Sequence, residues 1–147
     1  MGRFDLEKKL IVDTAHELVC KDFLMATGGN LSLRVKGQDV FAITPSNYDY
    51  MKMTQEDVCI LDFDLNMLEG HLKPSVESAM HGAVYQARAD VNAIVHTHQV
   101  YTSALTLIKS PIPALFDEQA RFLGRSVELI PYAPAGTGML KNTVAKQ

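Results

Sequence analysis

The sequence predicts an α/β protein folded as a single domain. The chain has 147 residues, of which 47% are hydrophobic, enough to bury one substantial core. An amphipathic helical pattern opens the chain, and segments with strand-like alternation follow it. Helical and strand-like segments then alternate in the second half. No repeat, low-complexity tract or linker divides residues 1–147, so we expect one structural unit.

Charge and composition exclude several kinds of partner. The net charge of -3 comes from interspersed acids and bases, so no basic field forms that would attract nucleic acid. The N-terminus lacks a signal-peptide layout and no apolar run is long enough to span a bilayer, which predicts a cytoplasmic protein with no membrane partner. Cys20 and Cys59 lie apart in apolar segments, and we expect both to be buried free thiols.

The first half predicts a helix followed by a β-meander. Apolar residues recur at helical spacing in the opening segment, with charged residues mostly on the other side. Two apolar segments then flank the turn KGQD as a hairpin would, and a third follows a short helical turn. We expect the helix at residues 4–24, strands at 31–35, 40–44 and 58–63, and the helical turn at 54–57.

The second half predicts helices alternating with strands. Pro74 opens a segment whose apolar residues recur on one helical face, and a short turn leads from it into the strand VNAIVHTH. Breaks at SPIP and YAPAGTG separate the later elements. We expect helices at residues 75–88, 100–108 and 118–123, strands at 91–98 and 127–130, and a last amphipathic helix beginning near residue 139.

Two histidines at the end of the strand VNAIVHTH are candidate metal ligands. Residues i and i+2 of a strand point to the same face, with Cβ atoms roughly 6–7 Å apart. His96 and His98 therefore share a face and can reach one Zn²⁺ at about 2.0–2.1 Å, while Val95 and Thr97 face the other way. The competing interpretation is a pair of ordinary, partly exposed sheet residues.

The helix before this strand carries a candidate acid. Glu77 and His81 lie four residues apart and share a helical face, so a carboxylate can fold back towards the metal. Alternatively, both are solvated helix residues. Polar loops at 27–30, 44–47 and 74–75 are rich in hydroxyls and free amides that can hold an anion, although each also suits an ordinary turn.

The ordered series TGGNLSLR, ITPS, KPSVES, HGAVYQARADVNAIVHTHQ, IPAL and YAPAGT resembles the class II aldolase/adducin family. The resemblance runs from the first helix to Gln147. It implies a three-layer α/β/α fold with a mostly antiparallel central sheet, and a homotetramer of C4 symmetry with active sites at subunit interfaces. The family's aldolases, epimerase, dehydratase, decarboxylases and non-catalytic adducin head share this scaffold.

The resemblance also implies roles for individual residues. His96 and His98 match two of three histidine ligands of Zn²⁺, and Glu77 matches the catalytic acid/base. The implied substrate is a ketose phosphate or a similar hydroxyketone, whose C–C bond breaks to leave an enediolate stabilised by the metal. We expect the pKa of Glu77 to be raised by a site closed to water. Substrate-binding positions are expected at Thr27, Gly28, Asn30, Thr44, Ser46, Asn47 and Ser75.

Three departures from the family pattern modify these expectations. The third histidine ligand has no counterpart, and the usual C-terminal strand and helices are expected to be missing, so His81 or Glu77 is a candidate replacement ligand. Val76 and Asn47 stand where a hydroxyl residue and glycine are usual, which predicts a reshaped anion pocket. Asp117 or Glu118 stands near the usual acid tyrosine; helix N-terminal charge is the simpler interpretation. A non-catalytic adducin-like module or inactive fragment is the alternative function.

Overall fold

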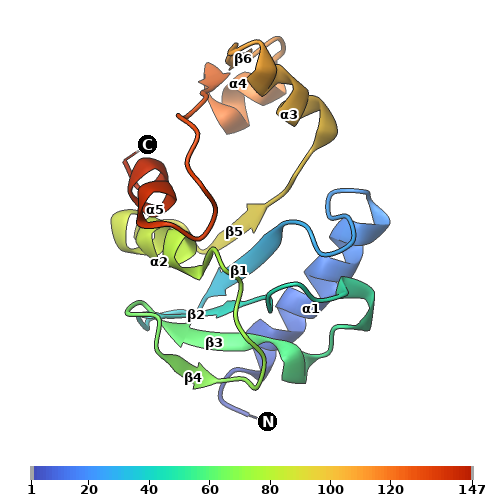
Figure 1. Ribbon diagram of the computed structural model, residues 1–147, viewed down its shortest axis with the longest axis vertical. Coiled ribbons are helices and arrows are strands. Elements are labelled where there is room, and N and C mark those ends of the chain that lie inside the picture. The colour runs from blue at the N-terminus through green and yellow to red at the C-terminus, as the bar shows by residue number, and fades with distance from the viewer. Residues whose placement is uncertain (1, 147) are drawn as a thin grey trace.

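The computed structural model describes residues 2–146 and shows a central sheet with helices on both faces (Figure 1). In chain order the elements are α1 (Asp5–Cys20), β1 (Asn30–Arg34), β2 (Val40–Ile43), the 3-10 turns η1 (Tyr50–Lys52) and η2 (Gln55–Asp57), β3 (Cys59–Asp62), β4 (Met67–Glu69), α2 (Ser78–Ala87), β5 (Ala93–His96), α3 (Val100–Leu107), β6 (Ile112–Pro113), α4 (Asp117–Leu123), β7 (Ser126–Val127) and α5 (Gly138–Val144).

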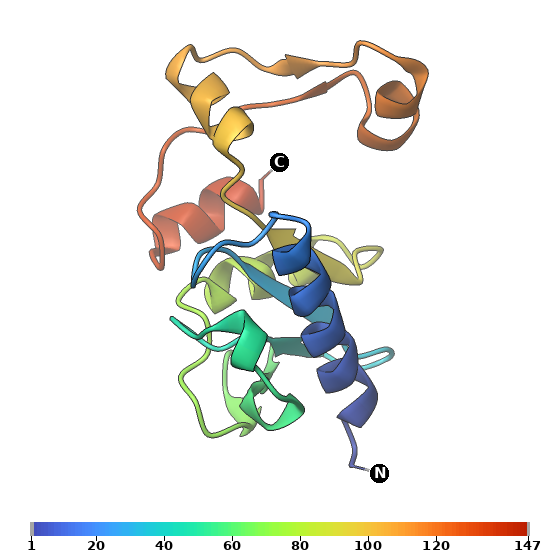
Figure 2. The same cartoon turned by 90° about the vertical axis from the view of Figure 1, so that its right-hand side faces the viewer.

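The main sheet has five strands in the order β4-β3-β2-β1-β5, and every neighbouring pair is antiparallel. α1 covers one face, while α2 covers the other and α5 packs against α2 (Figures 1 and 2). This arrangement confirms the predicted three-layer fold with a mostly antiparallel sheet. The predicted meander corresponds to β1, β2 and β3, and β4 extends it by one strand.

Alternation along the strands explains why the sheet is covered on both faces. Val40 and Ala42 of β2 belong to the core beneath α1, whereas Phe41 and Ile43 belong to the core beneath α2. All four are buried. Burying the side chains of Val40, Phe41 and Ile43 contributes about 1.5–3 kcal/mol each, and period-two alternation divides that burial between two helices.

The first helix is shorter than predicted because a left-handed residue ends it. Asp22 has a φ of 59°, and the amide of Phe23 donates to the carbonyl of Leu18 at 2.8 Å, a hydrogen bond typical of a Schellman motif. Cys20 is therefore in the last turn, and it is exposed, so its predicted burial is wrong. Cys59 on β3 is buried as predicted, and both thiols are free.

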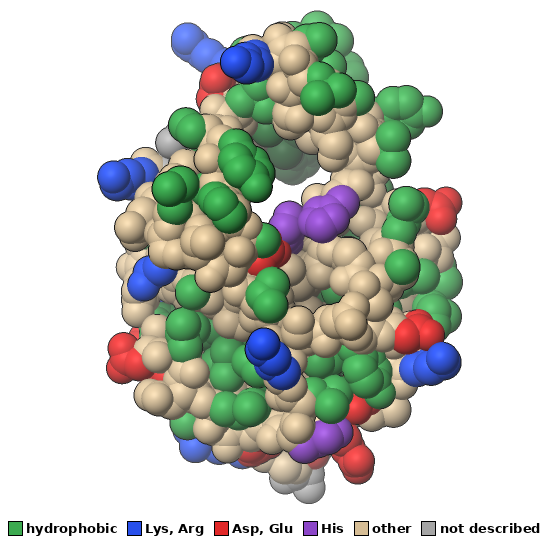
Figure 3. Space-filling model, in the orientation of Figure 1, with side chains coloured by type: hydrophobic (Ala, Val, Ile, Leu, Met, Phe, Trp, Pro, Cys, Tyr) green, Lys and Arg blue, Asp and Glu red, His purple; other side chains and the backbone are tan. Residues whose placement is uncertain are grey.

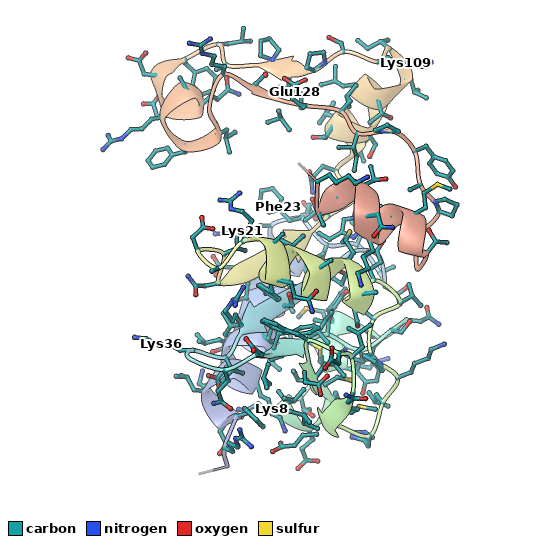
Figure 4. The ribbon with its side chains drawn as sticks, turned by 90° about the vertical axis from the view of Figure 1, so that its left-hand side faces the viewer. Lys8, Lys21, Phe23, Lys36, Lys109 and Glu128 are labelled. Atoms are coloured by element: carbon teal, nitrogen blue, oxygen red, sulfur yellow. The ribbon has the colours of Figure 1, made fainter. Side chains whose placement is uncertain are left out.

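Residues 100–132 form an extension that projects from the main body (Figure 2). It carries α3, α4 and a two-stranded sheet of β6 and β7. The strand predicted at 127–130 is only the short β7. Lys109 and Glu128 lie at this end of the molecule, opposite Lys8 (Figure 4). Neither helix of the extension buries a residue. Within residues 2–146, no helix has the length and apolar character needed to cross a membrane.

Large apolar side chains stand exposed along this extension and near its ends. Tyr101, Leu107 and Tyr132 are each more than four-fifths exposed. Monomeric soluble proteins rarely expose contiguous apolar patches of large area. The other members of the set are Val100, Ile108, Leu115, Phe116, Phe122, Leu123, Val127 and Ile130.

Gly29 precedes β1, and its lack of a side chain lets β1 pair closely with β5. Its φ is 77°, and a Cβ there would stand 2.5 Å from the carbonyl oxygen of His96. We expect Gly29→Ala to lower the free energy of unfolding by about 3 kcal/mol, measured by urea denaturation, because it adds overpacking to left-handed strain. The control is Gly37→Ala, which has a φ of 74° and no atom within 4 Å of the added Cβ. Equal losses in the two variants would contradict this account.

Candidate active site

The candidate site forms where β1, β5 and the start of α2 meet. Antiparallel pairing places Asn30 of β1 directly opposite His96 of β5. Because side chains alternate along a strand, Asn30 and Ser32 point to the face that α2 covers, whereas Leu31 packs in the core beneath α1. The register therefore brings an amide, a hydroxyl and an imidazole to one face.

Glu77 immediately precedes α2 and is the acid at this face. Its carboxylate is almost wholly buried, with 7% of the residue exposed. Oε2 accepts a hydrogen bond from Nδ2 of Asn30 at 2.6 Å and another from Nδ1 of His96. The interpretation of Glu77 as a solvated helix residue is therefore wrong.

The environment of Glu77 favours its charged form. The hydrogen bond from His96 lowers the pKa of Glu77, and the hydrogen bond from Asn30 lowers it further, which together outweigh the raising effect of burial. The predicted rise in this pKa is wrong in direction. Near neutral pH the side chain is a carboxylate, the state that a general base requires.

His96 and His98 lie side by side, although the strand predicted at 91–98 is only Ala93–His96 and leaves His98 outside it. Their ring centroids are 4.9 Å apart and their planes meet at 64°. His98 lies beyond the last residue of β5, and its ring packs against Gly28, where an added Cβ would be 3.4 Å from Nδ1. Histidine side chains line the hollow between the main body and the extension (Figure 3).

The histidine pair fits two positions of a metal site. His96 donates from Nδ1 to Glu77, which leaves its Nε2 available. A ligating histidine ordinarily passes its other N–H to a carboxylate in this way, which orients the ring. No group of three or more histidine, cysteine, aspartate or glutamate side chains in residues 2–146 is arranged to hold a metal, so the pair by itself is an incomplete set.

His81 does not complete that set. Its side chain is wholly buried, and both ring nitrogens have protein partners: Nε2 lies 2.6 Å from Oδ1 of Asn30, and Nδ1 lies 2.6 Å from Oγ of Ser32. Burial lowers the pKa of His81 to about 4, so the ring is neutral at physiological pH. The alternatives of a solvated residue and of a replacement ligand are both inconsistent with this position.

The loops predicted to hold an anion meet beside Glu77. The amide of Ser75 donates to the carbonyl of Thr44 at 3.1 Å, and the amide of Ser46 donates to the carbonyl of Lys73 at 2.9 Å. The amide of Glu77 donates to Oγ of Ser75 at 3.2 Å. Thr44 and Ser75 are buried. These two loops therefore lie side by side at the start of α2, where backbone N–H groups favour negative charge.

The remaining predicted positions lie at the rim of the site. Asn47 is exposed and has a φ of 54°, so it adopts the left-handed conformation that glycine usually supplies. Thr27 is exposed in the loop before β1, and Gly28 lies beside His98 rather than beside Glu77. Among the described hydrogen bonds, none links Thr27, Ser46 or Asn47 to the carboxylate.

The acid candidates of the second half are remote from the histidines within this chain. Asp117 and Glu118 are exposed in the first turn of α4, in the extension. Their position agrees with the simpler interpretation, in which acidic residues favour the start of a helix. Ser32 and Tyr85, by contrast, take part in the buried hydrogen bonds of the site and were missed. Ser32 is two residues from Asn30, and Tyr85 is four from His81, a spacing that could have indicated them.

The structure thus combines a three-layer fold with a buried carboxylate, a candidate acid–base group, beside two candidate metal ligands. Residues 9–147 match the family described as Class II Aldolase and Adducin N-terminal domain. The chain belongs to the class II aldolase and adducin family.

Relatives and solved structures agree with this assignment. The chain is 36% identical over 134 residues to a 5-deoxy-D-ribulose 1-phosphate aldolase of Bacillus thuringiensis serovar kurstaki, covering 91% of this chain and 62% of that protein. It is 38% identical over 135 residues to an L-fuculose phosphate aldolase of Escherichia coli O6:H1, covering 92% and 61% respectively. The chain thus spans less than two thirds of these curated relatives. A solved L-fuculose 1-phosphate aldolase superposes with a TM-score of 0.87 at 33% identity, covering 99% of this chain and 68% of that one.

Burial of His81 predicts a stability loss in mild acid. The pKa of His81 is 6.5 in the unfolded chain and about 4 in the folded protein. Between these two pH values the imidazole is protonated in the unfolded chain and neutral in the folded protein, so acid favours unfolding. The free energy of unfolding should fall by about 3 kcal/mol as the pH drops through this window, measured by urea denaturation. His81→Gln should lack this loss. If the free energy of unfolding of the unaltered protein and of His81→Gln changed equally with pH, the buried, neutral state of His81 would be contradicted.

Proposed function

We propose that this protein is a metal-dependent aldolase that cleaves or forms a C–C bond in a ketose phosphate or similar hydroxyketone. The observation that carries the proposal is the buried carboxylate of Glu77, which accepts a hydrogen bond from His96 beside His98. The names of the relatives support it, because both are aldolases of sugar phosphates. Acid–base chemistry needs a carboxylate held in a fixed position beside the reacting centre, and the hydrogen bonds from Asn30 and His96 to Glu77 support this role.

His96 and His98 would hold the metal, which we propose is Zn²⁺. Imidazole nitrogens suit this ion, and the Nδ1–H of His96 is already oriented by Glu77. When bound, the ion supplies Lewis-acid stabilisation of the charge that develops beside a ketone as the C–C bond breaks. Its third protein ligand is a group other than His81, whose ring nitrogens are engaged by Asn30 and Ser32.

Glu77 would transfer the proton at the carbon next to the ketone. In the condensation direction it removes that proton as a carboxylate, and in the cleavage direction it returns it. Its lowered pKa keeps it unprotonated before condensation begins. One carboxylate oxygen accepts both observed hydrogen bonds, so the other oxygen is left to face the reacting carbon.

The paired loops at the start of α2 would hold a substrate phosphate. Ser75 accepts from the amide of Glu77, so its hydroxyl hydrogen is free to donate. Asn30 and Thr44 stand on the same side, and the amides of the first turn of α2 add positive potential. Ser46, Asn47, Thr27 and Gly28 would contribute at the rim. Uncharged donors of this kind orient the phosphate rather than react with it.

We also propose a homo-oligomer, with C4 symmetry as the family resemblance implies. The exposed apolar side chains of the extension support an assembly in which another subunit covers them. The same surface is the feature that a non-catalytic, adducin-like interaction module would use. Retention of Glu77, His96 and His98 together favours the enzyme, since an interaction module has no need of this set. A cytoplasmic location stays a prediction.

Glu77→Gln should abolish most of the activity. With L-fuculose 1-phosphate and 5-deoxy-D-ribulose 1-phosphate as test substrates, we expect aldehyde release to fall by about 10³-fold, because general acid–base catalysis is lost. The matched control is Glu17→Gln, which removes an exposed carboxylate on α1. No aldehyde release by the unaltered protein would contradict the aldolase, and substrate consumption without aldehyde would indicate an epimerase, dehydratase or decarboxylase.

Metal content tests the histidine pair independently of the substrate. The purified protein should contain about one Zn²⁺ per subunit by elemental analysis, and His96→Ala or His98→Ala should lose it because a ligand is removed. His71→Ala is the control, since His71 is exposed and lies near Asp57 rather than the site. Zinc retained in both site variants, or absent from the unaltered protein, would show that the pair is no metal site.

A further inference from the structure

A continuous chain of buried side chains leads away from Glu77 into the layer between β1 and α2. Asn30 Nδ2 donates to Glu77 at 2.6 Å, and Asn30 Oδ1 lies 2.6 Å from Nε2 of His81. Nδ1 of His81 lies 2.6 Å from Oγ of Ser32, which in turn lies 2.7 Å from the hydroxyl of Tyr85. All five residues are buried. This series therefore connects the carboxylate of Glu77 to buried polar groups between β1 and α2.

The carboxylate of Glu77 determines which group donates in every hydrogen bond of this series of side chains. A carboxylate only accepts, so the amide nitrogen of Asn30 must face Glu77 and its carbonyl oxygen must face His81. A carbonyl oxygen also only accepts, so His81 must carry its proton on Nε2. The opposite amide orientation would place two oxygens in contact at 2.6 Å.

The same reasoning continues to the end of the chain. Since the neutral ring of His81 has its proton on Nε2, Nδ1 is an acceptor, and Ser32 must donate to it. The single hydroxyl hydrogen of Ser32 is then used, so Tyr85 donates to Ser32. Burial supports this state, because it lowers the pKa of His81 to about 4 and raises the pKa of Tyr85 to about 12.

We propose that His81 is a positioning residue: Ser32 and Tyr85 hold it as the Nε2–H tautomer, and it thereby fixes the amide of Asn30 so that this amide always donates to Glu77. The role rests on the proposed function, because it selects which oxygen of Glu77 is engaged and which is free for the substrate. His81 touches neither the histidine pair nor the carboxylate by a hydrogen bond, so it acts through Asn30.

Energetics indicate why this arrangement needs His81. A primary amide can rotate by half a turn. The carboxylate of Glu77 opposes the orientation that turns Oδ1 of Asn30 towards it, and the Nε2–H of His81 is the second partner that favours the donating orientation. A buried acceptor left unpaired costs about 1–3 kcal/mol, so the Nε2–H of His81 makes the donating orientation of Asn30 the favoured one. Without it, Oδ1 of Asn30 lacks a partner, and its amide can no longer hold Glu77 in one position.

Nitrogen-15 NMR of the whole protein tests the positioning role without a substrate. We expect His81 to carry its proton on Nε2, and the side-chain amide protons of Asn30 to exchange slowly with solvent. In His81→Leu that exchange should accelerate by about 10-fold, and in His81→Gln, whose amide can donate to Asn30, it should stay slow. Unchanged exchange in His81→Leu, or a proton on Nδ1, would overturn the proposal.

Two smaller variants keep the test decisive if His81→Leu fails to fold. Ser32→Ala removes the donor to Nδ1, and Tyr85→Phe keeps the ring that packs against Phe41 while it removes the hydroxyl. Ser32→Ala should accelerate amide exchange of Asn30 more than Tyr85→Phe does, because Ser32 is nearer. The control is Thr54→Ala, which removes a 2.8 Å hydrogen bond to Asp57 on another part of the molecule. If Thr54→Ala and Ser32→Ala accelerated the amide exchange of Asn30 equally, the effect would reflect the stability of the whole protein, and the positioning role would be contradicted.

Kinetics separate the positioning role from the proposed reaction. With L-fuculose 1-phosphate, His81→Leu should lower kcat by about 10-fold while KM changes less than about 2-fold, and His81→Gln should recover most of kcat. A larger change in KM than in kcat would contradict positioning of the acid. If the unaltered protein shows no turnover but the NMR results hold, the proposed function fails and the fixed orientation of Asn30 stands.

Discussion

The site depends on the two hydrogen bonds that one oxygen of Glu77 accepts from Asn30 and His96. These bonds join three elements, because Asn30 lies on β1, His96 on β5 and Glu77 at the start of α2. They also keep the carboxylate charged despite its burial, since donors to the charged form lower its pKa. The geometry of the candidate site and the packing of α2 against the sheet therefore rest on the same contacts.

A buried polar layer of this kind is stable only when its members satisfy one another. An unpaired polar group in the interior loses the hydrogen bonds of water and gains none. In residues 2–146, the buried side-chain nitrogen or oxygen without a partner is Nε2 of His16 on α1, outside this layer. The side chains of Asn30, Ser32, His81 and Tyr85 are paired with one another or with Glu77.

The sequence pattern predicted those parts of the site whose geometry depends on residues close together in the chain. The spacing of His96 and His98 requires a shared face on any strand, and their rings are adjacent. Glu77 was indicated by helical spacing, but the direction of its pKa shift was not. That shift depends on donors from two strands, which lie 47 and 19 residues away along the chain. His81 shows the same limit, because its burial depends on how α2 lies on the sheet.

The sequence by itself determined most of the order of elements and the two faces of each strand, because these follow from periodicities of the backbone. Tertiary structure decided which polar residues meet: the register of β1 against β5 set Asn30 opposite His96, and α2 carried His81 and Tyr85 to Ser32. Such contacts depend on through-space distances between remote segments, which no local pattern encodes. The charged state of Glu77 and the single tautomer of His81 follow from these tertiary contacts.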